Sequence, residues 1–322
     1  MMDKQKILHI TAGSNKLGYG HIRRSMELSK SLKRFFDVLF YIYFEGDNTK
    51  FTFPTQGVLI SKPFKDEKCD LVLLDMPERY AESAVEHYKK TMADVPMIAL
   101  GYYSTINGKP DVVINLDNIG RKVCHQSNYY TGLQYSIIRE SFVEFRKIKK
   151  NDQGLTNVII SLGGADIKGL SKLLIRSFER TVNSYKKIRY HLILGPLSKQ
   201  DIYRPELIDL KIYHAPSNLE SIMNQADIAV CNGGTMMIEY AYLGKSMIGI
   251  PQTALEEAFI RKFENNGAAI LIKPEQIQDR VCSELLGLIK SEKKREEMSI
   301  AAKEMVDGLG IQRIIDIIRK TI

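Results

Sequence analysis

The stretch ADIAVCNGGTMMIEYAYLGKSMIGIP, residues 226–251, decides the fold class. It begins with an apolar run that ends at Cys231, passes through Gly233 and Gly234 into a helical segment, and ends in a second apolar run over 245–251. Short apolar runs without alternation are typical of strands buried on both faces, and two such strands joined by a helix lie parallel in one sheet. The stretch therefore predicts an α/β protein.

The same alternation of strands and helices occurs on both sides of a charged and polar segment at 139–157. The other runs that read as strands are 6–12, 38–43, 57–60, 70–75, 96–100 and 111–115 before this segment, and 158–166, 190–196, 210–216 and 268–272 after it. We therefore expect two doubly wound, Rossmann-like domains, 1–148 and 149–322, with an inter-domain cleft at the carboxyl ends of their strands. The amphipathic helix over 310–322 is a candidate to cross back onto the first domain.

The composition is that of a soluble globular protein, with 44% hydrophobic and 26% charged residues. The net charge of +8 favours anionic partners, but the densest basic block, 145–150, reads as a solvated linker, so nucleic acid is not an expected partner. The 4 cysteines are too widely spaced for a zinc site or a disulfide scaffold, which favours free thiols and a cytoplasmic protein. No signal-peptide pattern precedes the first strand, and no apolar run approaches the roughly 18 residues of a transmembrane helix.

The turn made by Asn232, Gly233, Gly234 and Thr235 is a candidate site for a diphosphate. Two glycines let backbone N–H groups approach an anion, and the N-terminus of the following helix adds a partial positive charge. Glu239 lies one helical turn beyond Thr235, where its carboxylate can accept hydrogen bonds from both ribose hydroxyls. The alternative interpretation is a capped turn followed by a surface glutamate.

A second glycine pair, Gly163 and Gly164, follows the first predicted strand of the same half. Because both pairs stand at the carboxyl ends of strands, they can face a single ligand. Neither pair has the spacing of a dinucleotide-binding motif or a P-loop, which weakens those two interpretations. No cluster with metal-ligand spacing and no D-x-D pattern occurs in the sequence, so we expect a site without metal or other cofactor.

The corresponding turn of the first half, GYGHIRRS at 18–25, places His21 at the start of a helix. Gly18 and Gly20 keep the preceding loop free of bulky side chains. A helix N-terminus disfavours the protonated imidazole, so a neutral His21 beside a cleft is suited to act as a general base; the alternative is that it only caps the helix. Asp75 ends the fourth predicted strand, where it can face the same cleft or cap the next helix.

Four motifs follow one another along the chain. They are G-x-G-H-x-x-R over 18–24, G-x-x-Y-x-x-x-R-x-x-F over 132–142, S-x-G-G-x-D over 161–166 and G-G-x-x-x-x-E over 233–239. This order resembles the UDP-sugar hydrolases of the pseudaminic acid pathway, which belong to the GT-B superfamily. The resemblance implies a GT-B fold and an enzyme that removes UDP from UDP-2,4-diacetamido-2,4,6-trideoxy-β-L-altrose, with His21 as the base for water attacking the anomeric carbon.

The strand-end turns and the resemblance together give the residues expected to hold each part of the substrate. Those expected to bind the nucleotide are Gly163, Gly164, Ile212, Tyr213, Asn232, Gly233, Gly234, Thr235 and Glu239, with the strand at Ile212 and Tyr213 beside the uracil. Those expected to bind the rest of the substrate are Gly18, Tyr19, Gly20, Arg23, Asp75, Tyr135, Arg139, Glu256 and Glu257. Two departures concern the sugar: Glu256 and Glu257 replace an Asn-Gln pair of the family, and 100–108 lacks the family's acidic pair.

Three functions remain open from the sequence. A hydrolase would release UDP and a free sugar for the synthesis of a nonulosonic acid of the pseudaminic type. A GT-B glycosyltransferase would use His21 to deprotonate an unknown acceptor, and its first domain could then contact a membrane surface peripherally. A nucleotide-sugar-binding protein without activity is the third. The partner is a UDP-sugar in each case, and the sequence indicates no oligomeric state.

Overall fold

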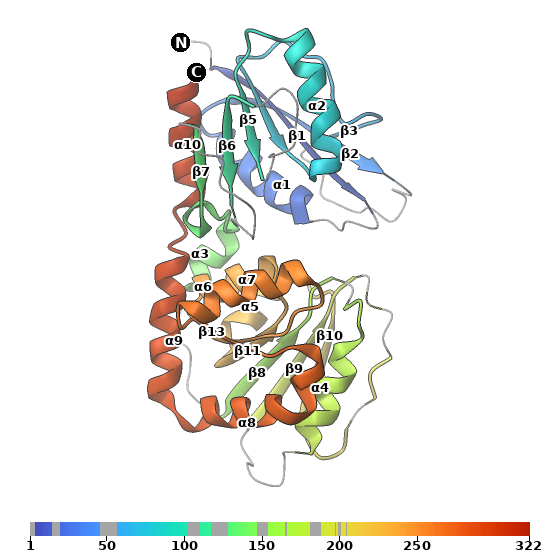
Figure 1. Cartoon of the computed structure of the whole chain (residues 1–322), viewed down its shortest axis with the longest axis vertical. Helices are drawn as coiled ribbons and strands as arrows, with labels where there is room; N and C mark the ends of the chain where they lie inside the picture. Colours follow the sequence, from blue (N-terminus) through green and yellow to red (C-terminus); the bar gives the residue numbers. More distant parts are fainter. Residues whose placement is uncertain are drawn as a thin grey trace. The chain divides into compact units, whose positions relative to one another are not determined.

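The structure is a computed structural model that describes residues 4–14, 20–45, 57–101, 110–116, 128–146, 154–164, 166–180, 188–196, 198, 201–203 and 205–322. The chain divides into two compact units, each built on its own sheet (Figure 1). Unit 1 comprises Met1–Arg139 and Gly308–Ile322, and unit 2 comprises Glu140–Asp307. The described strands of both sheets pair in parallel, which confirms the prediction of two doubly wound α/β sheets.

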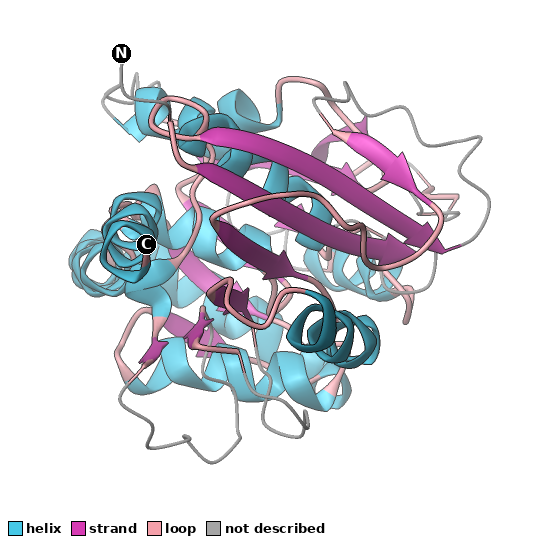
Figure 2. Ribbon diagram, turned by 90° about the horizontal axis from the view of Figure 1, so that it is seen from above, coloured by secondary structure: helices cyan, strands magenta, loops and turns pink. Residues whose placement is uncertain are grey.

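Unit 1 carries a seven-stranded sheet in the order β3-β2-β1-β4-β5-β6-β7. Its strands are β1 (Lys6–Ser14), β2 (Asp37–Glu45), β3 (Val58–Ile60), β4 (Leu71–Asp75), β5 (Met97–Leu100), β6 (Val112–Asn115) and β7 (Tyr129–Thr131). The two longest strands, β1 and β2, lie side by side (Figure 2). Ile7 packs into a core shared with α1 (Gly20–Leu32) and α10 (Gly310–Thr321), and Leu8 into a core with α2 (Glu78–Thr91), because successive side chains leave a strand on opposite faces.

The buried face of helix α1 contains polar as well as apolar side chains. Its buried residues follow the helical period, but two of the five are serines, Ser25 and Ser29, among Ile22, Leu28 and Leu32. A buried hydroxyl needs a hydrogen-bond partner, and both serines have one on the sheet below. The face of α1 that packs on the sheet is therefore partly polar, and this polar part lies next to the candidate site.

Unit 2 carries a six-stranded sheet in the order β10-β9-β8-β11-β12-β13. Its strands are β8 (Thr156–Ser161), β9 (Ile188–Leu194), β10 (Asp209–His214), β11 (Ile228–Cys231), β12 (Ser246–Gly249) and β13 (Ala269–Leu271). Its helices include α3 (Glu140–Arg146), α4 (Leu170–Glu179), α5 (Leu219–Asn224), α6 (Thr235–Tyr242), α7 (Ala254–Asn265), α8 (Ile277–Lys290) and α9 (Glu292–Met305). Residues of α4 and α8 pack with β8, β9 and β11 in its main core.

The division between the units lies at 139/140 and 307/308, whereas the sequence placed one boundary after 148. Helix α3 stays with unit 2, because Ser141 Oγ donates to Glu220 Oε1 at 3.0 Å and Arg146 stacks on the Tyr242 ring at 4.5 Å. Helix α10 packs within unit 1, where four of its isoleucines are buried and Arg313 Nη1 donates to the Gln134 carbonyl at 2.7 Å. Among the residues that the structure describes, no helix is both long and apolar enough to span a bilayer.

Candidate active site

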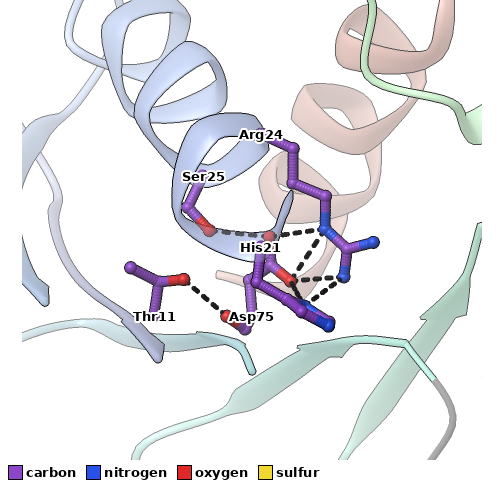
Figure 3. Close-up of polar contacts among 5 residues, drawn as sticks. All are labelled: Thr11, His21, Arg24, Ser25 and Asp75. Carbon is purple, nitrogen blue, oxygen red and sulfur yellow. Dashed lines mark hydrogen bonds and ion pairs between the residues drawn. The ribbon is translucent and has the colours of Figure 1, made fainter. Parts of the chain in front are cut away.

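A histidine, an arginine and a serine of α1 converge on one carboxylate in unit 1 (Figure 3). His21, Arg24 and Ser25 are three and four residues apart and so share one face of the helix. Asp75 is the last residue of β4, and the parallel register places it opposite Thr11 of β1. Both strands run toward the end of α1 that carries His21, so the fold brings the carboxylate to the start of the helix.

The Asp75 side chain is fully buried, and its oxygens are held by several donors. Arg24 Nε lies 3.0 Å from Oδ1 and 2.9 Å from Oδ2, Arg24 Nη2 lies 2.5 Å from Oδ1, and Ser25 Oγ donates to Oδ2 at 2.7 Å. Thr11 Oγ1 donates to the Asp75 carbonyl at 2.8 Å, which fixes the backbone as well. Burial acts to raise the pKa of Asp75, but the Arg24 charge and the hydrogen bonds from His21 and Arg24 hold it well below its ordinary value.

His21 contacts this ionised carboxylate through Nδ1, which lies 3.0 Å from Asp75 Oδ1. An ionised carboxylate only accepts hydrogen bonds, so the contact is a hydrogen bond when Nδ1 carries the proton. The lone pair of the neutral imidazole then lies on Nε2, the nitrogen that can take a proton from a substrate. The His21 side chain is 31% exposed, whereas that of Asp75 is not exposed at all. The imidazole is therefore accessible to solvent, while the carboxylate that it contacts is buried.

Sequence reasoning found two members of this cluster and missed two. His21 and Asp75 were both candidates, and the structure brings them together, but Asp75 was assigned to the substrate. The structure buries its carboxylate completely, in contact with His21 and Arg24. Arg23, the predicted substrate residue, is exposed, and its neighbour Arg24 contacts Asp75. The i, i+3 spacing from His21 to Arg24 was the available signal.

Of the other residues of unit 1 predicted to bind the substrate, Gly20 adjoins His21, two lie near the end of the first segment of unit 1, and two lie outside the described ranges. Gly20 begins α1, and a Cβ built on it meets nothing within 4 Å. Tyr135 packs its ring edge-on against Tyr130, with centroids 6.0 Å apart, beside the core shared with α10. Arg139 is half-buried at the end of unit 1. Gly18, Tyr19 and most of 100–108 lie outside the residues that the structure describes.

In unit 2, a buried glutamine joins the loops at the carboxyl ends of β8 and β12. Gln252, which follows β12, donates from Nε2 to the Leu162 carbonyl at 2.7 Å and accepts from the Lys168 backbone N–H at 3.2 Å. These two contacts fix both ends of the loop that contains Gly163 and Gly164. The first glycine pair is therefore held in place from the neighbouring loop.

Asn232 connects the second glycine pair to the same network. Its Nδ2 donates to Glu256 Oε1 at 2.7 Å, and a Cβ on Gly163 would lie 3.1 Å from this nitrogen. A Cβ on Gly233 would lie 2.5 Å from the Glu256 carbonyl oxygen, so the close approach of α7 requires glycine there. The turn 232–234 thus packs directly against the first turn of α7.

The two glycine turns differ at the helices that follow them. Asp166, which has a left-handed φ of 43°, accepts hydrogen bonds from the N–H groups of Leu170 and Ser171 at 3.0 and 2.9 Å and so satisfies the start of α4. Gly234 precedes α6 in extended conformation, and no side chain caps that helix. Thr235, its first residue, is exposed. Only α6, of these two helices, has an N-terminus without a capping side chain.

Glu239 and the strand β10 complete the nucleotide-binding set expected from the sequence. Glu239 is 5% exposed on α6, so the interpretation as a surface glutamate is wrong. Ile212 and Tyr213 lie on β10, the edge strand of the sheet. The Tyr213 ring stacks on buried His191, with centroids 5.9 Å apart, and its hydroxyl lies 3.1 Å from His191 Nδ1. An edge strand leaves backbone groups on its outer side for a ligand.

Glu256 and Glu257 have partners within unit 2, which accounts for carboxylates at these positions. Glu256 Oε2 accepts from the Gln252 N–H at 2.7 Å, and its own N–H donates to Thr253 Oγ1 at 3.2 Å, as in a capping box shifted by one residue. Burial raises the pKa of Glu256. Hydrogen bonds from Lys273 and Arg261 lower the pKa of Glu257, which pairs with both on the surface. Glu256 thus accepts hydrogen bonds from two neutral groups, and Glu257 pairs with two cations.

Within the described ranges, no group of three or more His, Cys, Asp or Glu side chains is placed to hold a metal ion. Residues 157–314 match the glycosyltransferase family 28 C-terminal domain. The match covers most of unit 2, including the glycine turns, the network around Gln252 and α6. The site in unit 1 lies outside it.

Three curated proteins are similar to the chain over much of its length. The spore coat polysaccharide biosynthesis protein SpsG of Bacillus subtilis is 25% identical over 95% of this chain and 96% of its own. The UDP-2,4-diacetamido-2,4,6-trideoxy-beta-L-altropyranose hydrolase of Campylobacter jejuni is 25% identical over 73% of this chain and 87% of its own. The uncharacterized protein MJ1062 of Methanocaldococcus jannaschii is 26% identical over 78% of this chain, and the match spans 56% of that protein.

Solved structures share the whole fold at low identity. MurG of Acinetobacter baumannii superimposes with a TM-score of 0.68 at 13% identity, over 98% of this chain and 99% of that one. MnaA of S. aureus, solved with UDP, gives a TM-score of 0.62 at 11% identity over 98% of this chain and 96% of that one. The chain therefore has the glycosyltransferase-like GT-B fold, and its residues 157–314 match the family 28 C-terminal domain.

Proposed function

We propose that the chain hydrolyses a UDP-sugar at the anomeric carbon, with His21 as the general base. The observation that carries this proposal is the contact between His21 Nδ1 and the buried carboxylate of Asp75, at 3.0 Å. A histidine oriented by a carboxylate is a common arrangement for moving a proton at neutral pH. Unit 1 carries this candidate base, and unit 2 carries the candidate nucleotide-binding turns.

The proposed reaction needs one proton transfer and one displacement. Water gives a proton to His21 Nε2 while its oxygen bonds to C1 of the sugar. The bond between C1 and the β-phosphate oxygen breaks, and UDP leaves with the electron pair. Asp75 keeps the ring oriented and offsets the imidazolium charge, as its buried position allows.

The departing diphosphate fits the turn Gly233–Gly234–Thr235, for two reasons. The N-terminus of α6 has no capping side chain, so its backbone N–H groups and its dipole are suited to an anion. The hydrogen bonds among Asn232, Glu256 and Gln252 hold the turn before any ligand arrives, which lowers the cost of binding. Glu239 is the candidate for the ribose, and the edge strand at Ile212 and Tyr213 for the uracil.

The substrate class that we propose is a UDP-2,4-diacetamido-2,4,6-trideoxyhexose, and the product a free sugar for a nonulosonic acid of the pseudaminic type. Two observations support this class: the four sequence motifs, and the similarity to the Campylobacter jejuni hydrolase that is named for such a sugar. We propose a metal-independent site in the cytoplasm.

A glycosyltransferase is the second candidate, because residues 157–314 match a glycosyltransferase domain. His21 would then deprotonate the hydroxyl of an acceptor instead of water, and the rest of the site would act in the same way. The two functions differ only in the nucleophile. They are therefore separated by what appears at C1 of the released sugar.

The test uses the full chain and a panel of UDP-sugars that includes UDP-2,4-diacetamido-2,4,6-trideoxy-β-L-altrose and UDP-N-acetylglucosamine. UDP release is followed in ¹⁸O-labelled water, with and without candidate acceptors. We expect release without an acceptor and one labelled oxygen at C1 of the free sugar. Release that depends on an acceptor would refute the hydrolase and support the transferase.

The His21→Ala variant should lose activity by about a hundredfold or more and keep its affinity for UDP. The matched control is His87→Ala, because His87 of α2 makes a comparable contact, Nε2 to Asp66 Oδ1 at 2.6 Å, on the surface of unit 1. Activity in that variant should be unchanged. An active His21→Ala protein would show that the base is another group.

A further inference from the structure

Nδ1 of His21 lies beside both a hydrogen-bond acceptor and a hydrogen-bond donor. Asp75 Oδ1 lies 3.0 Å from His21 Nδ1 and can only accept a hydrogen bond. Arg24 Nη2 lies 2.9 Å from the same nitrogen and can only donate one. Figure 3 shows the guanidinium beside the imidazole, with both side chains against the carboxylate. When Nδ1 carries the proton, it donates to Asp75, and the Arg24 guanidinium then lies beside the ring as a neighbouring cation that donates no hydrogen bond to it.

The charges of this cluster explain what the cation does. With His21 neutral, Arg24 and Asp75 cancel and the cluster carries no net charge. When His21 takes a proton, the cluster carries one net positive charge. This charge is partly shielded from solvent, since the side chain of Asp75 is fully buried and that of Arg24 is 23% exposed. A histidine paired with a carboxylate alone would instead reach zero net charge on protonation, and would keep its proton.

We propose that Arg24 is a positioning residue that balances the charge of Asp75, keeps His21 unprotonated, and so sets the acidic limit of the enzyme's activity. The inference rests on the proposed function, in which His21 is the base. This role of Arg24 also explains why a guanidinium lies against Asp75. Arg24 Nε reaches both carboxylate oxygens and Nη2 reaches Oδ1 as well, so the ion pair survives while His21 gains and loses its proton.

Other charges around the cluster leave this balance intact among the described residues. On β1, His9 is fully buried, and burial lowers its pKa to about 4, so it is neutral at the pH of the cytoplasm. On α10, which packs against α1, Arg313 donates to the Gln134 carbonyl, and Asp316 pairs with Arg319. The main charges that act on the pKa of Asp75 are those of Arg24 and then of His21.

The test compares variants that remove the charge with one that keeps it. Arg24→Met removes the charge at similar length, Arg24→Gln removes it but keeps an N–H donor for the carboxylate, and Arg24→Lys keeps it without the forked geometry. The pH dependence of kcat/KM for UDP release is measured on the full chain. We expect the acidic limb to move up by about one to three pH units in Arg24→Met and Arg24→Gln. In Arg24→Lys it should stay in place while kcat falls.

A uniform fall of activity at all pH values, with the limb unmoved in Arg24→Met or Arg24→Gln, would refute the proposal and leave Arg24 a structural role only. The glutamine variant secures the test if the methionine variant does not fold, because it still donates to Asp75. An NMR titration of the His21 ring, assigned by comparison with His21→Gln, reports the same shift without any turnover. If no UDP-sugar is hydrolysed, the proposed function fails, and the titration still decides the role of Arg24.

Discussion

Replacing Asp75 by asparagine tests how much the buried carboxylate contributes to the proposed base. The amide has one oxygen and one NH₂ group where the carboxylate has two acceptors. With the NH₂ group toward His21, it donates to Nδ1, and the proton of the imidazole moves to Nε2, which is then no base. With the oxygen toward His21, the tautomer is kept, but the imidazolium forms beside Arg24 with no anion to offset it. Both orientations weaken the base.

The size of the effect follows from the distances. His21 Nδ1 and Asp75 Oδ1 are 3.0 Å apart, and Asp75 is fully buried. Two unit charges about 4 Å apart interact by about 4 kcal/mol at an effective dielectric constant of about 20. Loss of this term from the transition state corresponds to about a thousandfold in kcat/KM. The unpaired Arg24 should also cost up to about 3 kcal/mol of folding stability, at the low end for a buried pair because Arg24 is 23% exposed.

The assay is a double-mutant cycle on UDP release with Asp75→Asn, His21→Ala and the pair. We expect Asp75→Asn to cost about a thousandfold in the wild-type background and less than about threefold in the His21→Ala background, because the two residues act as one unit. The affinity for UDP, measured by calorimetry, should not change. Asp66→Asn, which breaks the exposed contact to His87, is the matched control. A folded Asp75→Asn protein within about tenfold of wild-type activity would refute the reasoning.

Two further predictions concern the nucleotide turn and the core of unit 1. Asn232→Asp places a second carboxylate at the position that now donates to Glu256 Oε1 at 2.7 Å, so UDP should bind about tenfold more weakly by calorimetry. Adding Glu256→Gln should restore much of the affinity, and an unchanged dissociation constant in the single variant would count against the turn as the diphosphate site. His9 has its pKa lowered from 6.5 to about 4, so the unfolded chain binds more protons between these values, and stability falls as the pH drops through this window, by about 3 kcal/mol in all. Urea unfolding at pH 7 and pH 4.5 should show that His9→Leu loses less folding stability on acidification than the wild type. Equal losses of stability would contradict the lowered pKa of His9.

The sequence predicts the strands and helices well where neighbouring residues along the chain determine them. Apolar runs over 70–75 and 226–231 are strands in the structure, because a strand buried on both faces needs no alternation. His21 and Asp75 are 54 residues apart, yet both stand at ends of elements that a parallel sheet brings to one edge. Their presence at one edge was therefore predictable, but their contact was not, since no sequence pattern tells which way a side chain turns.

The contacts of Arg24 and Glu256 are ones that the sequence does not predict. Neighbouring arginines on a helix differ by about 100° around the axis, and only the packing of α1 on the sheet decides which one meets Asp75. Glu256 was unexplained beside a diphosphate site until the structure supplied Asn232 and the Gln252 N–H as partners. These are tertiary contacts between loops that follow different strands, and their geometry depends on the whole sheet.

The two glycine turns differ in a way that favours one of them as the proposed diphosphate site, which the glycines alone do not. Each turn precedes a helix in unit 2, but Asp166 already accepts the N–H groups at the start of α4, and an anion there would meet its negative charge. No side chain caps α6, and the carboxylate nearest to its turn, Glu256, is held by Asn232 and by the Gln252 N–H. The N-terminus of α6 is thus the better place for an anion, and it is where we propose that the diphosphate binds, at Gly233–Thr235. The turn at Gly163 and Gly164, held by Gln252, supports its neighbour by lying against Asn232.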